Sequence, residues 1–162
     1  MDEDVRRLAA TIGTAAQARG RTVIAAESVT AGSVGQALAA AGEASEWFAG
    51  SLVTYMDLTK RTVLGVEADD VFTAECARQM ASGALRVSGA DVAVAITGVA
   101  GPEPEDGHEV GEVHICVGSA DSLETFEHRL SGEPVDIVDA AKLHALEHLL
   151  AALTDGASPA TG

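Results

Sequence analysis

Apolar residues at the start of the chain follow helical spacing and then change to a continuous run. Residues 3–19 carry apolar side chains at helical spacing, and the pattern stops at Gly20, a residue type that often follows a helix. A strand is predicted at residues 21–26, because residues 23–26 form the short apolar run expected of a central strand that is buried on both faces. A second helix is predicted over residues 31–41, with Thr30 as its N-cap.

The same exchange between strand and helix patterns continues through the middle of the chain. A strand is predicted at residues 51–55, and Asp57 is expected to cap the helix that follows it. Thr73 is expected to cap the next helix, which ends near Gly89. Residues 92–97 form a third apolar run and predict a third buried strand.

The last third of the chain alternates apolar and polar residues twice. Residues 113–117 and 126–130 show this alternation with turn residues at 119–122 between them, which predicts an antiparallel hairpin at one side of the sheet. Pro134 begins a long final helix. The predicted fold class is therefore α/β: a three-layer α/β/α sandwich on a mixed, mostly parallel sheet with an antiparallel hairpin.

Length and charge limit the classes of function. The chain has 162 residues, and we assign residues 1–153 to a single domain and residues 154–162 to a flexible C-terminal tail. Its formal net charge of −15 arises from 25 acidic against 10 basic residues. A field of this sign repels nucleic acid and anionic membrane surfaces, so we expect neither as a partner.

The cysteines and the N-terminus favour a cytoplasmic location. Cys76 falls in a predicted helix and Cys116 in a predicted strand, which indicates small buried core residues rather than nucleophiles or metal ligands. The N-terminus is acidic, and no apolar run approaches membrane-spanning length. We therefore expect a cytoplasmic protein.

Familiar ligand-binding motifs give little support for a cofactor or metal. Neither GxxxxGK[ST] nor a GxGxxG after a strand is present, so no nucleotide cofactor is predicted. Gly98 and Gly101 form only a GxxG, although it follows a buried strand, where ligands often bind in α/β sheets. His144 and His148 stand four positions apart without a matching carboxylate or cysteine, so no metal site is predicted.

Ser28 occupies the point where the first strand pattern gives way to the second helix pattern. A hydroxyl there lies beside the unpaired N–H groups that open a helix, and both features favour chemistry on carbonyl or anionic groups. A second strand-to-helix junction carries Tyr55 and Lys60. Taken singly, these residues also have ordinary interpretations: a serine in a turn, a half-buried strand tyrosine and a solvated helix lysine.

Several blocks of residues are recognisable as a set. They are residues 26–32 (AESVTAG), Trp47-Phe48, Val53-Thr54-Tyr55 with Lys60 five positions later, Leu64-Gly65-Val66, and residues 97–102 (TGVAGP). In this order and spacing the chain resembles, over nearly its whole length, the CinA C-terminal domain family, which includes nicotinamide mononucleotide amidohydrolases (deamidases). The resemblance implies hydrolysis of nicotinamide mononucleotide to nicotinic acid mononucleotide and ammonia, a step of pyridine-nucleotide salvage. It also leads us to expect a homodimer.

The resemblance places the family's catalytic serine at Ser28, its tyrosine at Tyr55 and its lysine at Lys60. A serine hydroxyl needs a base to attack an amide, and the matching blocks contain no histidine, so Lys60 must serve. The start of a helix disfavours an ammonium by about 0.3–1 kcal/mol. Burial must supply the rest of the pKa depression. Tyr55 then relays the proton or holds the other two side chains in register.

The remaining site residues are implied to contact the substrate. Backbone N–H groups around residues 29–31 are candidates to bind the oxyanion, and the helix start near Thr30, the amides of residues 98–101, and Lys60 or Arg61 are candidates for the phosphate. The full set is Glu27, Val29, Thr30, Ala31, Gly32, Thr97, Gly98, Ala100 and Gly101.

Some positions depart from the family's pattern. His108-Glu109 stands where relatives often have Lys-Pro, and Pro134, Val138 and Asp139 stand where relatives have basic residues. If those cations bind the substrate phosphate, this chain has lost part of the contact. Two hypotheses follow: an amidohydrolase acting on nicotinamide mononucleotide or a related amide, or a catalytically silent relative that binds a nucleotide-like ligand or a protein partner.

Overall fold

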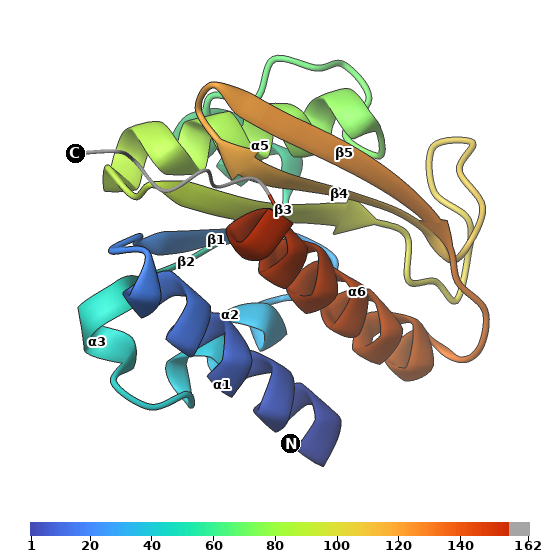
Figure 1. Cartoon of the computed structure of the whole chain (residues 1–162). Coiled ribbons are helices and arrows are strands. Elements are labelled where there is room, and N and C mark those ends of the chain that lie inside the picture. Colours follow the sequence, from blue (N-terminus) through green and yellow to red (C-terminus); the bar gives the residue numbers. More distant parts are fainter. Residues whose placement is uncertain (156–162) are drawn as a thin grey trace.

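The computed structural model describes residues 1–155, and its elements follow the predicted alternation of helices and strands, with one additional short helix at Ala44–Trp47 (Figure 1). In chain order they are α1 Glu3–Ala18, β1 Val23–Glu27, α2 Ser33–Ala39, α3 Ala44–Trp47, β2 Phe48–Val53, α4 Asp57–Leu64, α5 Ala74–Ser88, β3 Val92–Gly98, β4 Glu112–Ser119, β5 Ser122–Arg129 and α6 Pro134–Asp155. Among these residues, no helix has the length and apolar character that a membrane span requires.

One five-stranded sheet, in the order β2-β1-β3-β4-β5, divides the molecule into three layers. β1 pairs in parallel with both β2 and β3, whereas β4 is antiparallel to β3 and to β5. Helices α1, α2 and α6 pack on one face of the sheet, and α4 and α5 pack on the other (Figure 1). The α/β class, the mixed sheet and the terminal hairpin are thus confirmed.

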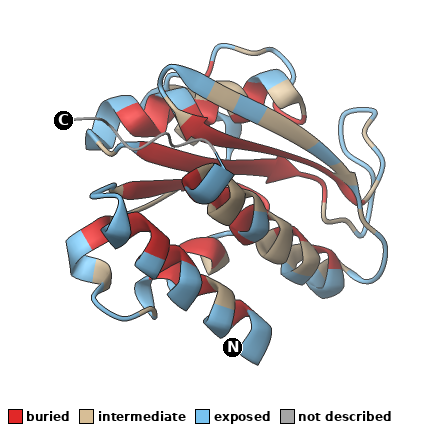
Figure 2. Ribbon diagram, viewed as in Figure 1, coloured by how far each residue is buried: buried red, intermediate tan, exposed pale blue. Residues whose placement is uncertain are grey.

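Each central strand alternates between two separate cores although its sequence is continuously apolar. Val23 and Ala25 of β1 face α1 and α6, while Ile24 and Ala26 face α5. Figure 2 shows β1 and β3 as buried along their whole length. The layers on both sides exclude water from these strands, so polar groups become accessible only where the strands end.

A glycine of α5 lets α4 and α5 approach closely on this side of the sheet. A Cβ on Gly83 of α5 would lie 2.0 Å from the carbonyl oxygen of Leu64, the last residue of α4. That distance is far below van der Waals contact, so the position requires glycine. This contact fixes α4, and with it Lys60.

The start of α2 differs from the prediction. The helix begins at Ser33, and its N-cap position is Gly32 with φ 101°, so Thr30 is not the N-cap. The hydroxyl of Thr30 instead donates to a carboxylate oxygen of Glu27 at 2.7 Å. The prediction was wrong because a side chain at the end of the preceding strand supplies the cap, which local sequence spacing does not reveal.

Two other boundaries also moved. β2 begins at Phe48 rather than Ser51, because its residues from Phe48 onward pair with β1. Met56, not Asp57, holds the N-cap position of α4. Thr73 does cap α5, accepting a hydrogen bond from the N–H of Cys76 at 3.1 Å.

The end of α6 lies beyond the predicted domain boundary. Thr154 and Asp155, predicted to lie in the C-terminal tail, form its last residues. The rest of the predicted tail, residues 156–162, lies outside the described residues.

Candidate active site

Ser28 is the first residue after β1, in the turn that leads to α2, and it is 5% exposed. Its N–H donates to the carbonyl of Ile96 in β3 at 3.0 Å, and its own carbonyl accepts from the N–H of Ala31 at 3.0 Å. Both the N–H and the carbonyl of Ser28 are therefore fixed by hydrogen bonds. Within residues 1–155 the Ser28 hydroxyl has no hydrogen-bond partner, so it is available to a ligand.

The two strand-to-helix junctions predicted to carry the chemistry leave the sheet side by side. Parallel pairing aligns Glu27 at the end of β1 with Val53 at the end of β2, and the N–H of Thr54 donates to the Glu27 carbonyl at 2.8 Å. Because the carboxyl ends of parallel strands meet at one edge, Ser28 and Tyr55 leave from the same edge of the sheet.

Glu27 is fully buried and its carboxylate is held by five donors. They are the hydroxyls of Thr30 and Ser51 and the N–H groups of Gly32, Val34 and Gly35. Three of these donors open α2, where the positive end of the helix dipole also favours a negative charge. Glu27, predicted to contact substrate, thus lies beneath the turn and shapes it.

The backbone around Ser28 leaves two N–H groups unused. Ala31, with φ 48°, donates its N–H to Ser28, and Gly32 donates to Glu27. Within residues 1–155 the N–H groups of Val29 and Thr30 have no hydrogen-bond acceptor. Adjacent backbone donors beside a nucleophile are the components of an oxyanion hole. Of the backbone N–H groups at residues 29–31 that were predicted to bind the oxyanion, those of Val29 and Thr30 are the ones left unpaired.

Lys60 lies in α4 with 1% of its surface exposed, which is unusual for a lysine. Its Nζ donates to the backbone carbonyl of Tyr55 at 2.8 Å. Burial lowers the pKa of Lys60, and the nearby Cys76, Asp57 and Glu105 offset part of this decrease. A buried amine with a lowered pKa is the form in which lysine acts as a base.

Tyr55 contributes its carbonyl to Lys60, while the residue as a whole is 63% exposed. It belongs to an exposed apolar stretch that also contains Val53, Met56 and Leu58. The predicted catalytic role of the phenol stays a prediction, and the contact that the geometry gives is the one through the backbone.

The third strand brings residues 97–101 to the same edge, because β3 pairs in parallel with β1 on the side opposite β2. The buried hydroxyl of Thr97 donates to the carbonyl of Val71 at 2.7 Å. A Cβ on Gly98 would lie 2.6 Å from the carbonyl oxygen of Glu112, so Gly98 is closely packed. Ala100 and Gly101 are partly exposed and are the members of this set that remain accessible to a ligand.

The candidate phosphate contacts are few. The guanidinium of Arg61, one predicted candidate, donates to the carbonyls of Val66 and Ala68 at 3.3 and 2.9 Å. Glu109 is exposed, and exposed Asp139 pairs with Lys142 at 3.1 Å. Val138 and Pro134 lie in the first turns of α6. Lys60 is likewise engaged, because it is buried and donates to the Tyr55 carbonyl, so the predicted phosphate contacts left unpaired within residues 1–155 are backbone N–H groups such as those near Thr30.

The cysteines are buried, as predicted. Burial raises the pKa of both the Cys76 and Cys116 thiols to about 11, so both are neutral thiols at physiological pH. Cys76 lies close enough to Lys60 for each to affect the other's pKa.

The histidines on α6 meet a third histidine that the sequence spacing did not reveal. Nε2 of His128 in β5 lies 2.8 Å from Nε2 of His148, and the ring of His128 stacks on His144 at 4.1 Å. In the part of the chain that the structure describes, no group of three or more His, Cys, Asp or Glu side chains is arranged to hold a metal ion.

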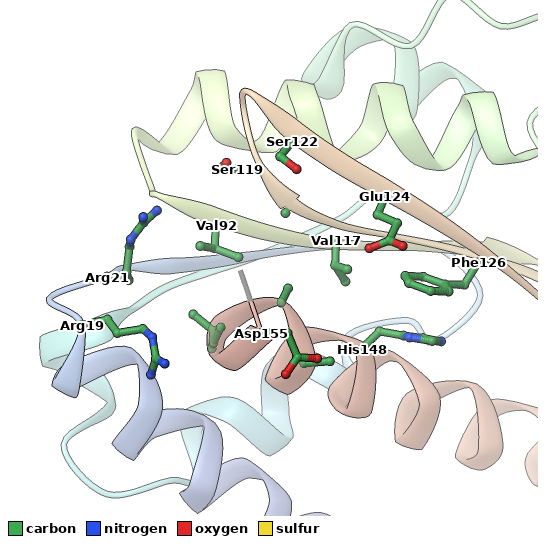
Figure 3. Close-up of a pocket in the computed structure, with 14 residues that line it drawn as sticks. Arg19, Arg21, Val92, Val117, Ser119, Ser122, Glu124, Phe126, His148 and Asp155 are labelled. Carbon is green, nitrogen blue, oxygen red and sulfur yellow. The ribbon is translucent and has the colours of Figure 1, made fainter. Parts of the chain in front are cut away.

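A pocket of about 510 Å³ lies at the other end of the sheet (Figure 3). Figure 3 shows Arg19 and Arg21 at one side of it and Phe126 and His148 at the other. Arg21 precedes β1, whereas Ser28 follows that strand. This pocket is therefore separate from the candidate active site.

A polar network beside the 98–111 loop had no sequence signal. His108 joins Asp70, 38 residues away, to Glu112, and Glu112 also meets His114 and Arg129. No short motif relates these residues, because they come from the α4–α5 connection, the β3–β4 loop and two strands.

Comparison with known proteins agrees with this architecture. A crystal structure of a Competence-Damaged Protein (CinA) superfamily protein from Klebsiella pneumoniae matches with a TM-score of 0.89 and 32% identity, covering 93% of this chain and 98% of that one. The competence/damage inducible protein CihA from Agrobacterium tumefaciens matches with a TM-score of 0.87 and 33% identity, covering 93% of this chain and 96% of that one.

Proteins related by sequence also carry the CinA name, but the chain matches only about a third of their length. A CinA-like protein from Mycobacterium sp. (strain JLS) is 41% identical over 151 residues, which cover 88% of this chain and 35% of that protein. The chain spans between 31% and 35% of the length of the first curated relatives that it matches. The sequence model described as "CinA C-terminal domain" matches residues 5–153. The chain therefore belongs to the CinA C-terminal domain family.

Proposed function

We propose that this protein is a serine–lysine amidohydrolase that deamidates nicotinamide mononucleotide, or a closely related amide, to the corresponding acid and ammonia. The family includes nicotinamide mononucleotide deamidases. The observation that carries the proposal is Lys60: a buried amine with a lowered pKa, held at the sheet edge where the unpartnered hydroxyl of Ser28 lies.

The proposed reaction needs only groups at this edge. Neutral Lys60, directly or through Tyr55, accepts the proton of the Ser28 hydroxyl as Oγ attacks the amide carbonyl carbon. The N–H groups of Val29 and Thr30 bind the oxygen that becomes negative. The Lys60 ammonium then returns a proton to the leaving nitrogen, and ammonia departs. Water, deprotonated by Lys60, then attacks the Ser28 ester, the acid is released, and the Lys60 ammonium returns the proton to Ser28 Oγ.

Release of ammonia from nicotinamide mononucleotide by the purified protein tests the proposal directly. Ser28→Ala should abolish turnover without unfolding the protein, because it removes one oxygen at a strand end and no core volume. Ser122→Ala, at the exposed start of β5, is the matched control and should retain full activity. Near-normal activity in Ser28→Ala would exclude a serine nucleophile.

A second candidate function is favoured by the state of the basic residues: Arg61 is already hydrogen-bonded within the protein, and an acidic residue stands at a position that is basic in relatives. Because Arg61 is bound to carbonyls and Asp139 stands at a position that is basic in relatives, the edge has little positive charge to hold a phosphate. A catalytically silent protein that binds a nucleotide-like ligand or a protein partner would share this geometry. Calorimetric binding of nicotinamide mononucleotide without ammonia release would favour the silent protein.

A further inference from the structure

Four aromatic rings meet between β5 and α6. Phe126 and His128 stand two positions apart on β5, so they share one face of that strand, and His144 and His148 stand four positions apart on one side of α6. Phe126 stacks on His148 with ring centroids 3.8 Å apart (Figure 3), and His128 stacks on His144 with centroids 4.1 Å apart. We call these four rings the histidine cluster.

The contacts within the histidine cluster limit how many protons it can carry. Nε2 of His128 lies 2.8 Å from Nε2 of His148, and a hydrogen bond between these atoms needs one N–H and one lone pair. One charged ring can donate to a neutral one. Two charged rings would place N–H against N–H and bring like charges together. The stack of His128 on His144 opposes a second charge for the same electrostatic reason.

Charged groups around the cluster do not remove this limit. Glu147 lies 3.2 Å from Nδ1 of His144 and favours a charge on that ring. His148 also lines the pocket of Figure 3, which contains two acidic and two basic side chains, namely Glu124, Asp155, Arg19 and Arg21. Burial lowers the pKa of His128 and of His148 from the ordinary value of 6.5, and charged neighbouring rings lower it further, whereas Glu147 offsets part of this decrease.

Of the two elements that the cluster joins, β5 is the more weakly held. It lies at one edge of the sheet, next to β4, and its residues are exposed or only partly buried. Helix α6 instead places fully buried side chains in the core, among them Ala145, Leu146 and Leu149. Because exposing these side chains costs more than exposing those of β5, loss of the ring contacts should move β5 and leave α6 in place.

We propose that the histidine cluster is a pH-sensitive latch: it holds β5 against α6 while no more than one of its rings is charged, and it releases β5 when a second ring takes up a proton. Between the ordinary value of 6.5 and their lowered pKa values, His128 and His148 bind fewer protons in the held state than in the released state. The latch is therefore fully stable above 6.5 and weakens as pH falls through that range. β5 and β2 form opposite edges of the sheet, so the latch acts whether or not the protein deamidates an amide.

NMR titration of ring-labelled histidine tests the electrostatic part of the latch, because the chain has five histidines and each gives its own curve. The titration midpoints of His128 and His148 should lie below 6.5. His144→Gln should raise both midpoints, and His128→Gln should raise that of His148, because each change removes a neighbouring charge. His108→Gln, outside the cluster, is the control and should change neither. A midpoint of His128 or His148 at or above 6.5, or an unchanged His148 in His128→Gln, would contradict the latch.

Amide hydrogen exchange tests whether a second charge releases β5. With intrinsic exchange rates corrected for, the β5 amides should lose protection at about pH 5 relative to about pH 7.5, while those of β1 and β3 keep theirs. The double variant His128→Gln/His148→Gln cannot charge the hydrogen-bonded pair and should keep β5 protected at the lower pH. Unchanged protection of β5 in the wild type, or an equal loss in the double variant, would overturn the proposal.

A second variant covers the case in which the double variant does not fold. His128→Phe keeps a ring on β5 to stack on His144, and it removes the ring that contacts both other histidines. At acid pH this variant should protect the β5 amides better than the wild type does. Protection no better than that of the wild type would show that charge on the cluster does not release β5.

Discussion

Lys60 shows how a single residue can be shaped for chemistry at the expense of stability. Its folded-state pKa is lowered from the ordinary value of 10.5, chiefly by burial, so the folded protein binds fewer protons than the unfolded chain between these two values. The contribution of Lys60 to the free energy of unfolding therefore rises with pH between its folded-state and unfolded-state pKa values. It is least favourable below the folded-state pKa, where the lysine is charged in both states. At neutral pH the buried amine destabilises the fold.

Lys60→Met should separate these two effects. We expect the deamidation rate to fall by at least about 100-fold, the lower range for loss of a general base. We expect the melting temperature to rise, by about 2–4 °C for each kcal/mol of burial cost removed. Lys142→Met, which replaces a lysine paired with Asp139, serves as the control in both the rate assay and thermal denaturation. Loss of activity together with a lower melting temperature would show that the amine stabilises the fold.

The pH dependence of the wild-type rate follows from the same residue. Only the neutral amine accepts a proton, so kcat/KM should increase as pH rises through the Lys60 pKa, which lies below 10.5. Steady-state rates measured across pH check this. A rate that is independent of pH on its acid side would remove Lys60 as the base.

At the scale of elements, two contacts between neighbouring segments position the site. Glu27 at the end of β1 accepts the first N–H groups of α2, so the strand itself caps the helix and the turn that carries Ser28 is held from below. Gly83 of α5 lets that helix approach Leu64, the last residue of α4. Helix α4 also carries Lys60. Neither contact involves substrate, yet both decide where the two proposed reacting groups lie.

Gly83→Ala tests the second contact. The added Cβ would lie 2.0 Å from the Leu64 carbonyl oxygen, so α4 must move, and we expect a loss of about 1–3 kcal/mol in the free energy of unfolding. Because Lys60 moves with α4, the rate should fall by more than the unfolded fraction explains. Gly42→Ala is the control, since a Cβ there meets no atom within 4 Å. Chemical denaturation and rate assays on both variants give the comparison.

At the scale of the whole molecule, most of the exposed large apolar residues belong to one segment of the chain, which also carries Tyr55 and Lys60. Of the eight large hydrophobic residues exposed within residues 1–155, five belong to one stretch, namely Val53, Tyr55, Met56, Leu58 and Val63. β2 is also an edge strand of the sheet. Exposed apolar clusters of this kind commonly mark interfaces, and edge strands are covered in most stable proteins.

We propose that a second copy of the chain covers this stretch, in line with the expected homodimer. Leu58→Asp, at a residue that is 71% exposed, should convert the dimer to a monomer in light-scattering measurements. Val135→Asp, at a residue that is 64% exposed on α6, should leave the mass unchanged. A monomeric wild type at all concentrations would exclude this arrangement.

The sequence by itself determined the order of the strands and of every helix except the short α3, together with the outline of the candidate site. Hydrophobic periodicity is local, so the buried strands at β1 and β3, the terminal hairpin and the Thr73 cap could all be predicted from spacing. The positions of Ser28 and Lys60 at strand-to-helix junctions were also local facts. Their order and spacing indicated the family, which the family match and the related structures then showed.

Tertiary structure alone decided which groups are free to act. Glu27, Thr97 and Arg61 looked available in the sequence, but partners far along the chain or across the sheet engage each of them. Helix α4, which carries the buried Lys60, packs closely against α5, and His108 lies 2.6 Å from a carboxylate oxygen of Asp70, 38 positions away in the chain. Burial and hydrogen bonding depend on distances through space, whereas sequence patterns report only the path along the chain.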